Sequence, residues 1–365
     1  MRDGILALAV ETSCDETAVA ILRGRDRLLA SEIASQVALH REFGGVVPEV
    51  ASRNHLVKIK PLIGAALKRA GEAISDLDCI AATRGPGLLT SLLVGYSVAK
   101  GLAIGLRKPF IGVNHLEGHL LSPFFGEPGG PTPSVGLIVS GGHTMLIQLE
   151  GVGAYRVLGQ TLDDAAGEAF DKVAKLLALG YPGGPILDRL ARCGNPHAVD
   201  FGRVRMKGNP LDFSFSGLKT AVLYRVRGTS LQAEAEQRRI WRESAGRATT
   251  EETLSHCSQA TLDLIASFQN AVVADLVERT LAAADTCRVR SVFVSGGVAC
   301  NSLLRERFRE AARQTGLQAL FPSPALSTDN AAMIAAAGYY KLMAGQHADS
   351  SFTAHASLPL GRSNR

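Results

Sequence analysis

The first recurring feature of the chain is a pair of short apolar runs on either side of a polar turn. Residues 5–10 and 18–22 are apolar, and the segment between them is polar. The same order returns where residues 135–139 and 145–149 enclose the polar turn at 140–144. Runs of this length around a small polar tip predict β-hairpins. Their repetition at a distance predicts a duplicated α/β domain with a cleft between the copies.

Helical spacing fills the intervals between these hairpins. A third apolar run, residues 292–298, breaks at Gly296 and Gly297 and leads into a helical pattern at 301–308. Apolar residues recur at helical spacing in four other segments, which predicts helices there. These segments are residues 51–70, 92–105, 164–178 and 261–284. A Pro/Gly-rich linker at 127–133 marks the expected domain boundary.

Composition narrows the class of protein. The chain has 365 residues, of which 46% are hydrophobic and 20% charged. No uninterrupted apolar run reaches about 18 residues, so no membrane span is expected. The six cysteines form no C-x-x-C pair, which is typical of reduced thiols in an intracellular enzyme and not of a disulfide scaffold. We therefore expect a Gly-rich α/β protein of the cytoplasm.

Positive charge is concentrated in one stretch. The net charge is +5, and residues 201–247 hold ten basic and four acidic side chains. A localised basic segment is a candidate contact for a polyanion such as RNA. A solvated helix and loop would give the same pattern, and charge alone does not separate the two.

Two histidines four residues apart give the strongest candidate for chemistry. His115 and His119 would share one face of a helix and could bind one metal ion. At 100° per residue, Glu117 would point about 200° away from His115 around the helix. It could therefore not serve as the general base that a zinc peptidase needs beside its metal. We interpret Glu117 as a supporting or capping group. Asp329, just before an apolar helix, is either that helix's N-cap or a third ligand. Two surface or satisfied histidines without a metal remain the alternative.

Glycine-rich turns and isolated carboxylates form a second group. Ser140-Gly141-Gly142 and Ser295-Gly296-Gly297 each follow a strand, where backbone N–H groups can approach a phosphate. Ordinary turn chemistry explains either one alone. Asp15 and Glu16 stand at the tip of the first hairpin and Asp171 in a helix; such acids are either solvated or face a ligand as a general base.

Ten motifs in this order resemble one known family. They are residues 11–17 (Glu-Thr-Ser-Cys-Asp-Glu-Thr), 44–49 with 51–53, 85–87, 115–119 (His-x-Glu-Gly-His), 139–144, 167–172, 181–185, 215–220, 294–299 and 328–331. The chain resembles the TsaD family, the bacterial tRNA N6-adenosine threonylcarbamoyltransferases once described as glycoproteases. The match spans roughly residues 5–340, and the first motif is similar to the bacterial and organellar branch.

This resemblance implies a fold, a reaction and a set of site residues. The fold would be of the actin-like ATPase type, with two duplicated α/β domains around a cleft. The reaction would move threonylcarbamoyl from threonylcarbamoyl-AMP to N6 of adenosine 37 in tRNAs that read codons beginning with A. One divalent metal, Fe²⁺ first and Zn²⁺ as the alternative, would be bound by His115, His119 and Asp329. The adenylate would be held by Ile138, Val139, Ser140, Gly141, Gly142, Asp171, Gly184, Asp188 and Asn301, and the catalytic acid or base would be Asp15 with Glu16 as its neighbour.

The resemblance also implies partners, whereas the Pro/Gly linker, the polar stretch and the loss of periodicity along the chain predict the domain plan. Besides tRNA, the partners would be a paralogous actin-like subunit that forms a heterodimer and a small P-loop ATPase. Residues 1–126 with a returning helix at about 328–346 would form the N-terminal domain. Residues 132–327 would form the C-terminal domain, with a basic insertion at about 225–258 that is partly helical and partly mobile. Residues 347–365 would be a flexible tail.

Two other functions stay open at this point. A metal-dependent peptidase of glycoproteins would need a base beside the metal, which the position of Glu117 does not supply. A non-catalytic actin-like nucleotide-binding subunit would not need the metal ligands. Consumption of threonylcarbamoyl-AMP that requires tRNA would identify the transferase. Cleavage of a peptide substrate would identify the peptidase.

Overall fold

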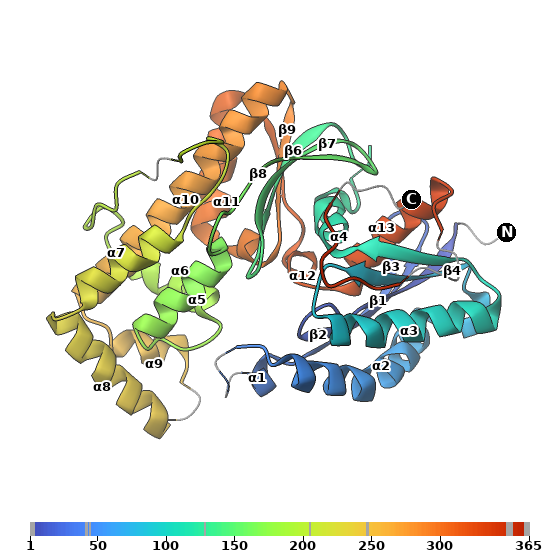
Figure 1. Ribbon diagram of the computed structural model, residues 1–365, viewed down its shortest axis with the longest axis horizontal. Coiled ribbons are helices and arrows are strands. Elements are labelled where there is room, and N and C mark those ends of the chain that lie inside the picture. Colours follow the sequence, from blue (N-terminus) through green and yellow to red (C-terminus); the bar gives the residue numbers. More distant parts are fainter. Residues whose placement is uncertain are drawn as a thin grey trace. The chain divides into compact units, whose positions relative to one another are not determined.

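The computed structural model describes two compact units, each with its own sheet (Figure 1). The residues described are 4–40, 43, 45–127, 129–203, 206–245, 248–347 and 353–360. Unit 1 comprises Met1–Pro133, Leu149–Arg156 and Phe321–Arg365, and unit 2 comprises Ser134–Gln148 and Val157–Leu320. The end of the chain thus returns to the first unit, and so does the tip of a hairpin from the middle of the sequence.

Unit 1 is built on a five-stranded sheet of order β3-β2-β1-β4-β5. Its strands are β1 (Leu6–Glu11), β2 (Glu16–Arg23), β3 (Arg27–Ser35), β4 (Cys79–Gly85) and β5 (Phe110–Asn114). The predicted first hairpin is confirmed, because β1 and β2 pair antiparallel with Leu6 opposite Arg23. The strands β4 and β5 extend the sheet in parallel. Every residue of β1 and β4 is buried, as expected for central strands covered on both faces.

Helices cover this sheet. They are α1 (Val37–His40), α2 (Pro48–Ala70), α3 (Leu89–Leu106), α4 (His115–Leu121), α12 (Pro324–Ser327) and α13 (Ala331–Met343), with short 3₁₀ turns η2 (Ile74–Asp76) and η3 (Ser122–Phe124). Helices α2 and α3 pack together on one side, and α13 packs with α4 against the same strands (Figure 1). Apolar residues of β1, β2, β4, α2 and α3 form a continuous core. This packing fixes where β5 ends and α4 begins.

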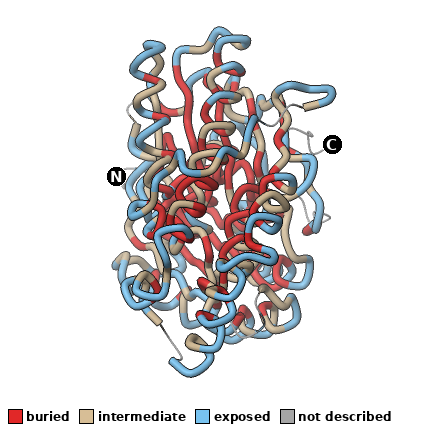
Figure 2. The backbone as a smooth tube through the Cα atoms, turned by 90° about the vertical axis from the view of Figure 1, so that its left-hand side faces the viewer, coloured by how far each residue is buried: buried red, intermediate tan, exposed pale blue. Residues whose placement is uncertain are grey.

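Unit 2 repeats the plan with a sheet of order β10-β9-β6-β7-β8. Its strands are β6 (Ser134–Val139), β7 (Thr144–Gly151), β8 (Ala154–Gln160), β9 (Ser291–Ser295) and β10 (Gln318–Leu320). Its helices are α5 (Ala166–Leu176), α6 (Gly183–Leu190), α7 (Ser216–Val226), α8 (Ser230–Ala245), α9 (Thr250–Ser255), α10 (Gln259–Cys287) and α11 (Ser302–Thr315), with η4 (Ala191–Cys193) and η5 (Gly297–Cys300). The central strands β6 and β9 are buried throughout, whereas the edge strands β8 and β10 are mostly not. Figure 2 colours the buried positions of the backbone red.

Residues 353–360 differ from the expected flexible tail. The His355 N–H donates to the Arg84 carbonyl over 2.8 Å, and the Gly87 N–H donates to the Ala356 carbonyl over 3.1 Å. Ala354 and Leu360 are buried. The segment forms no helix or strand, so its hydrogen bonds to unit 1 leave no periodic pattern in the sequence. The rest of the predicted tail beyond residue 347 lies outside the described residues.

The basic insertion is largely helical where it is described. It contains α8 and α9, and Thr249 caps α9 by accepting from the Glu252 N–H over 3.1 Å. Two of its residues, 246 and 247, lie outside the described part of the chain. Arg238 is almost fully buried and pairs with Glu234 one turn earlier. Part of the basic charge counted in the sequence is therefore used inside unit 2.

Two helices, α3 and α10, are long and apolar enough to cross a membrane by length and composition alone. Within their most apolar windows, 39% of α3 and 67% of α10 is buried inside the structure. Core helices of soluble proteins meet the same criterion, so the finding is weak evidence for a span.

Candidate functional site

The two histidines lie at the start of α4, directly after β5. The Asn114 side chain caps this helix, accepting from the Leu116 N–H over 2.9 Å. His115 and His119 are 6% and 1% exposed, and their ring centroids lie 4.7 Å apart in an edge-to-face arrangement. Both imidazoles therefore come from successive turns of one buried helix. The histidines are not surface residues, and satisfied buried histidines remain the alternative to a metal site.

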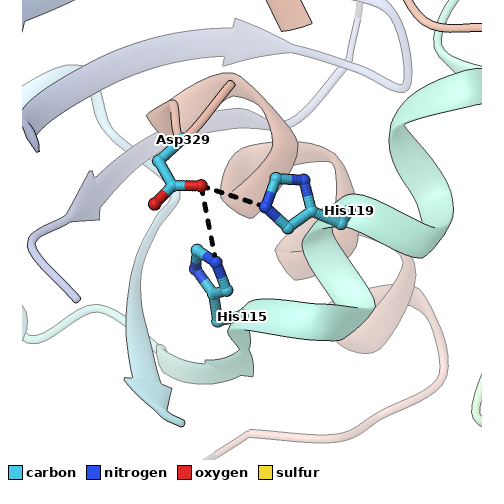
Figure 3. Close-up of side chains that lie close together, drawn as sticks. All are labelled: His115, His119 and Asp329. Atoms are coloured by element: carbon cyan, nitrogen blue, oxygen red, sulfur yellow. Dashed lines mark hydrogen bonds and ion pairs between the residues drawn. The ribbon is translucent and has the colours of Figure 1, made fainter. Parts of the chain in front are cut away.

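Asp329 meets this pair from the far end of the sequence (Figure 3). Its Oδ1 lies 3.0 Å from His119 Nε2 and 3.5 Å from His115 Nε2. Asn330, not Asp329, is the N-cap of α13, because the Asn330 side chain accepts from the Met333 N–H over 2.9 Å. The N-cap interpretation of Asp329 is thus wrong, and its carboxylate is left to face the imidazoles.

The three side chains form a donor set suited to a divalent cation. One ligand atom from each can be chosen so that all lie within 4.8 Å of one another. Two imidazole nitrogens and one carboxylate oxygen match the ligands of Zn²⁺ and Fe²⁺ sites that keep open positions. His119 Nδ1 is buried without a hydrogen-bond partner among the described residues, so only Nε2 of this ring is engaged. The cluster therefore fits a metal site.

Glu11, which the sequence did not single out, supports this cluster from behind. It is the fully buried last residue of β1, and its Oε2 lies 3.2 Å from His115 Nδ1. Burial alone would lower the pKa of His115, but Asp329 and Glu11 raise it to about 9. Burial would raise the pKa of Glu11, whereas His115 holds it below its usual value. A charged residue ending an otherwise apolar strand was the available signal.

Glu117 faces a different set of partners. Its carboxylate accepts from the Tyr155 hydroxyl over 2.9 Å and lies 3.4 Å from Lys341 Nζ. It is buried, and these polar contacts are to Tyr155 and Lys341 and not to the paired imidazoles. The expected supporting or capping role is not what the structure shows, since Asn114 caps α4 and Glu11 contacts His115. Glu117 instead joins α4 to α13 within unit 1.

Asp15 and Glu16 lie on the turn from β1 to β2. The Glu16 Oε1 accepts from the Ser35 hydroxyl over 2.8 Å, and burial raises the pKa of Glu16 to about 7. The turn is held by buried His55, whose Nε2 lies 3.0 Å from the Cys14 carbonyl. His55 Nδ1 lies 2.8 Å from the Thr17 hydroxyl. The sequence placed His55 only within a helix, so its bonds to the turn were missed.

The glycine turn after β6 has open space beside its two glycines. The Ser140 N–H donates to the His143 carbonyl over 2.8 Å and closes the turn. A Cβ added at Gly141 or Gly142 would meet no described heavy atom within 4 Å. Gly167, by contrast, has no room, because its Cβ would lie 2.5 Å from the Ser140 carbonyl oxygen. The packing of unit 2 thus explains why residue 167 is a glycine. It does not explain the glycines at positions 141 and 142.

The second glycine turn, after β9, needs its glycine for the backbone. Gly296 has φ of +93°, and a Cβ there would lie 2.4 Å from the Val139 carbonyl oxygen. Val139 and its neighbour Ile138 are fully buried. Neither residue exposes side-chain or backbone atoms, so of the predicted adenylate set these two lie within the packed sheet.

The polar members of the predicted adenylate set already bind parts of unit 2. Asp171 accepts from the Gly183 N–H over 2.7 Å, and burial raises its pKa. Asp188 accepts from both the backbone and the hydroxyl of Ser302. Asn301 caps α11 and donates to the Gln269 side chain over 2.9 Å. Gly184 has open space where a Cβ would lie. These groups hold α5, α6 and α11 in place beside the turns.

Known sequences decide the family. The family profile described as TsaD, tRNA N6-adenosine threonylcarbamoyltransferase, matches residues 27–336. A protein of that name from Symbiobacterium thermophilum is 51% identical over 356 residues, covering 98% of this chain and 97% of its own. Another from Koribacter versatilis is 48% identical over 381 residues, covering 99% and 100%. The chain belongs to this family.

Solved structures agree on the fold. The crystal structure of T. kodakarensis HypF has a TM-score of 0.60 and 13% sequence identity to this chain, and covers 93% of it and 48% of HypF. A full-length HypF in phosphate- and nucleotide-bound form has a TM-score of 0.57, with 13% identity, and covers 93% and 46%. The TsaD family member described here therefore has the actin-like ATPase fold, and the expected α/β class is confirmed. The expected transferase class is confirmed as well, and the peptidase and non-catalytic alternatives are not favoured.

Proposed function

We propose that this chain forms N6-threonylcarbamoyladenosine at position 37 of tRNAs that read codons beginning with A, using threonylcarbamoyl-AMP as donor and one divalent cation. Family membership supports the transfer to tRNA. The convergence of His115, His119 and Asp329 from opposite ends of the sequence carries the metal-assisted part. Fe²⁺ is the preferred ion and Zn²⁺ the alternative, since both accept two imidazoles and a carboxylate.

The three ligands set the geometry of the cation site. A bound divalent cation would act as a Lewis acid toward the donor and orient it. His115 and His119 present Nε2 from adjacent turns of α4, so their spacing is fixed by the helix. Asp329 brings a negative charge to a buried site, which offsets the positive charge that the site would hold.

The glycine turn of unit 2 would hold the adenylate. The N–H groups of Gly141 and Gly142 can approach a phosphate closely because no side chain intervenes. Ser140 and the backbone of Ile138 and Val139 lead into the turn, and Gly184, Asp188 and Asn301 complete the set. Asp171 would keep α6 in position through the Gly183 N–H. Positioning of the donor would supply a large part of the rate.

A carboxylate on the β1–β2 turn would accept the proton of the attacking amine. Asp15 is the proposed base and Glu16 its neighbour. The pKa of Glu16, about 7, lets this group exchange a proton near neutral pH. General-base catalysis of this kind contributes about 10²–10⁴-fold in rate.

The protein is proposed to work in the cytoplasm with tRNA and two protein partners. These partners would be a paralogous actin-like subunit and a small P-loop ATPase. Exposed basic side chains in the described part of the 201–247 stretch, such as Lys207 and Arg227, would contact tRNA phosphates. Adenosine 37 in the anticodon loop is accessible as an unstacked base.

Mass spectrometry of tRNA nucleosides tests the proposal. The chain, its two partners, threonylcarbamoyl-AMP and unmodified tRNA are combined with and without a chelator. We expect the modified nucleoside only without the chelator, and very little from the purified chain alone. Modification at full rate with the chelator would overturn the metal-assisted mechanism, and cleavage of a glycoprotein without tRNA modification would favour the peptidase.

A further inference from the structure

Glu11 is a buried carboxylate that the proposed reaction does not use. It is fully buried at the end of β1, and its side chain reaches one of the proposed metal ligands from the side opposite Asp329. His115 Nδ1 lies 3.2 Å from Glu11 Oε2, while His115 Nε2 lies 3.5 Å from Asp329 Oδ1. The two nitrogens of this ring therefore face two different carboxylates.

The hydrogen bonds of Glu11 leave it only one way to meet the imidazole. Its Oε1 accepts from the Ser13 N–H, and its Oε2 accepts from the Thr83 hydroxyl. A carboxylate is only an acceptor, so the short contact with His115 requires the proton to be on Nδ1. With that proton fixed on Nδ1, Nε2 is the nitrogen that faces Asp329 and that can give up its proton when a cation binds. His119 has no such support, because its Nδ1 lacks a partner among the described residues.

We propose that Glu11 is a positioning residue that keeps the proton of His115 on Nδ1, so that Nε2 is free to bind the cation. This inference rests on the proposed metal-assisted function. Metal-bound histidines commonly donate their other ring N–H to a carboxylate, and loss of that partner typically weakens metal affinity about 10–100-fold.

Replacement of Glu11 by Gln makes the test sharp. If the Gln oxygen takes the Oε1 position and accepts from the Ser13 N–H, its NH₂ group faces His115 Nδ1 and Thr83. The NH₂ group is a donor, so it favours the tautomer with the proton on Nε2, which blocks the metal side. In the opposite amide orientation, the NH₂ group would face the Ser13 N–H. This orientation is unfavourable because both groups are hydrogen-bond donors.

Ser13 offers an alternative explanation that can be tested separately. Its hydroxyl lies 3.1 Å from the same Nδ1 and could also accept the proton. Ser13→Ala removes this hydroxyl and leaves the Glu11 carboxylate in place. Glu117→Gln is the matched control, because it neutralises another buried carboxylate of unit 1 that contacts Tyr155 and Lys341.

The experiment is a Co²⁺ titration of the full chain in competition with a chromophoric chelator. We expect wild type to bind one Co²⁺, Glu11→Gln to bind about 10–100-fold more weakly, and Ser13→Ala and Glu117→Gln to stay near wild type. Equal binding by Glu11→Gln, or a loss confined to Ser13→Ala, would overturn the role of Glu11 while leaving the metal centre intact. Absence of Co²⁺ binding by wild type would overturn the metal centre and the role of Glu11 together.

A measurement on wild type keeps the inference testable should Glu11→Gln fold poorly. Nitrogen NMR of ring-labelled histidine in the Zn²⁺-loaded chain reports which ring nitrogen carries the proton, with His115→Asn providing the assignment. We expect a protonated Nδ1 and a metal-bound Nε2 for His115. The reverse arrangement would contradict the proposal without any change to Glu11.

Discussion

The metal cluster of unit 1 and the glycine turns of unit 2 are held in opposite ways. In unit 1 the functional atoms belong to buried side chains that already point at one another, with Nε2–Oδ1 distances of 3.0 and 3.5 Å. In unit 2 the polar side chains are engaged in structural bonds, such as that from the Gly183 N–H to Asp171. There the groups left open are backbone atoms around Gly141 and Gly142.

This contrast suits the two proposed ligands. A small cation needs a few donor atoms at fixed distances, which buried and mutually braced side chains provide. A phosphate-bearing nucleotide needs an open surface of N–H groups, which a turn without side chains provides. The same α/β plan therefore supports two kinds of site, according to whether side chains or backbone are left available.

Removal of a metal ligand is the most severe test of this contrast. His119→Ala deletes a donor of the cluster itself, so we expect metal affinity and tRNA modification to fall by more than the roughly 100-fold upper end typical for supporting residues. The Co²⁺ titration and the nucleoside assay measure the two effects. If the two sites are held independently, His119→Ala should weaken binding of threonylcarbamoyl-AMP to unit 2 far less than it weakens metal binding. Equal losses of metal affinity and donor affinity would contradict that expectation.

A side chain at the open turn tests the second region. Gly142→Val adds a side chain where no described atom lies within 4 Å of a Cβ, so the fold should tolerate it. We expect the KM for threonylcarbamoyl-AMP to rise about tenfold, equivalent to about 1.4 kcal/mol, with Co²⁺ affinity unchanged. Steady-state kinetics with the complete set of partners measures the effect.

Gly183→Ala is the matched control for that substitution. Its Cβ would lie 2.5 Å from the Ala174 Cβ, so overpacking should lower the free energy of unfolding by about 1–3 kcal/mol. An unchanged KM for Gly142→Val, together with the expected loss of stability in Gly183→Ala, would mean that the open turn does not face the donor.

How much of this could be predicted from sequence depends on the region. The hairpin of β1 and β2 and the spacing of His115 and His119 follow local patterns, and both are confirmed. The role of Asp329 was open, because an aspartate beside a helix start has the pattern of a cap. Only the structure shows that Asn330 takes the cap and frees Asp329.

Contacts between distant segments were the part that local pattern could not reach. Glu11 and His115 are 104 positions apart, and neither periodicity nor spacing links them. Residues 353–360 were expected to be flexible for the same reason: their partners Arg84, Gly87 and Asn114 lie far away in the sequence. Within the described residues, the sequence patterns missed these long-range polar contacts and also the strands β3, β4, β5, β8 and β10.

Truncation after Phe352 probes whether this terminal segment braces the metal cluster. It removes the Leu358 carbonyl, which accepts from the Asn114 side chain over 3.0 Å, and the bonds to Arg84 and Gly87. Because Asn114 caps α4, we expect the free energy of unfolding to fall by about 2 kcal/mol and Co²⁺ affinity to fall by less than tenfold. Urea denaturation and the Co²⁺ titration measure these. An affinity loss as large as that of His119→Ala would make the segment part of the site.

Glu16 provides the smallest and most specific test, through pH. Burial raises its pKa in the folded chain to about 7, above the usual 4.5, so the folded state binds the proton more tightly than the unfolded state. The free energy of unfolding therefore contains a component that is full below pH 4.5, decreases as pH rises toward 7, and is constant above that. Glu16→Gln removes this component, so we expect the variant to gain stability relative to wild type as pH rises from 5 to 7.5. Urea denaturation at both pH values measures this stability difference, which should be small because the Glu16 side chain is partly exposed.

A second variant, Ser35→Ala, removes the hydroxyl that donates to Glu16. It should increase the pH dependence of stability, because a hydrogen bond that favours the ionised carboxylate is lost. If the stability difference between Glu16→Gln and wild type is the same at both pH values, the Glu16 carboxylate is ionised throughout this range. Its side chain is then less buried in solution than in the structure.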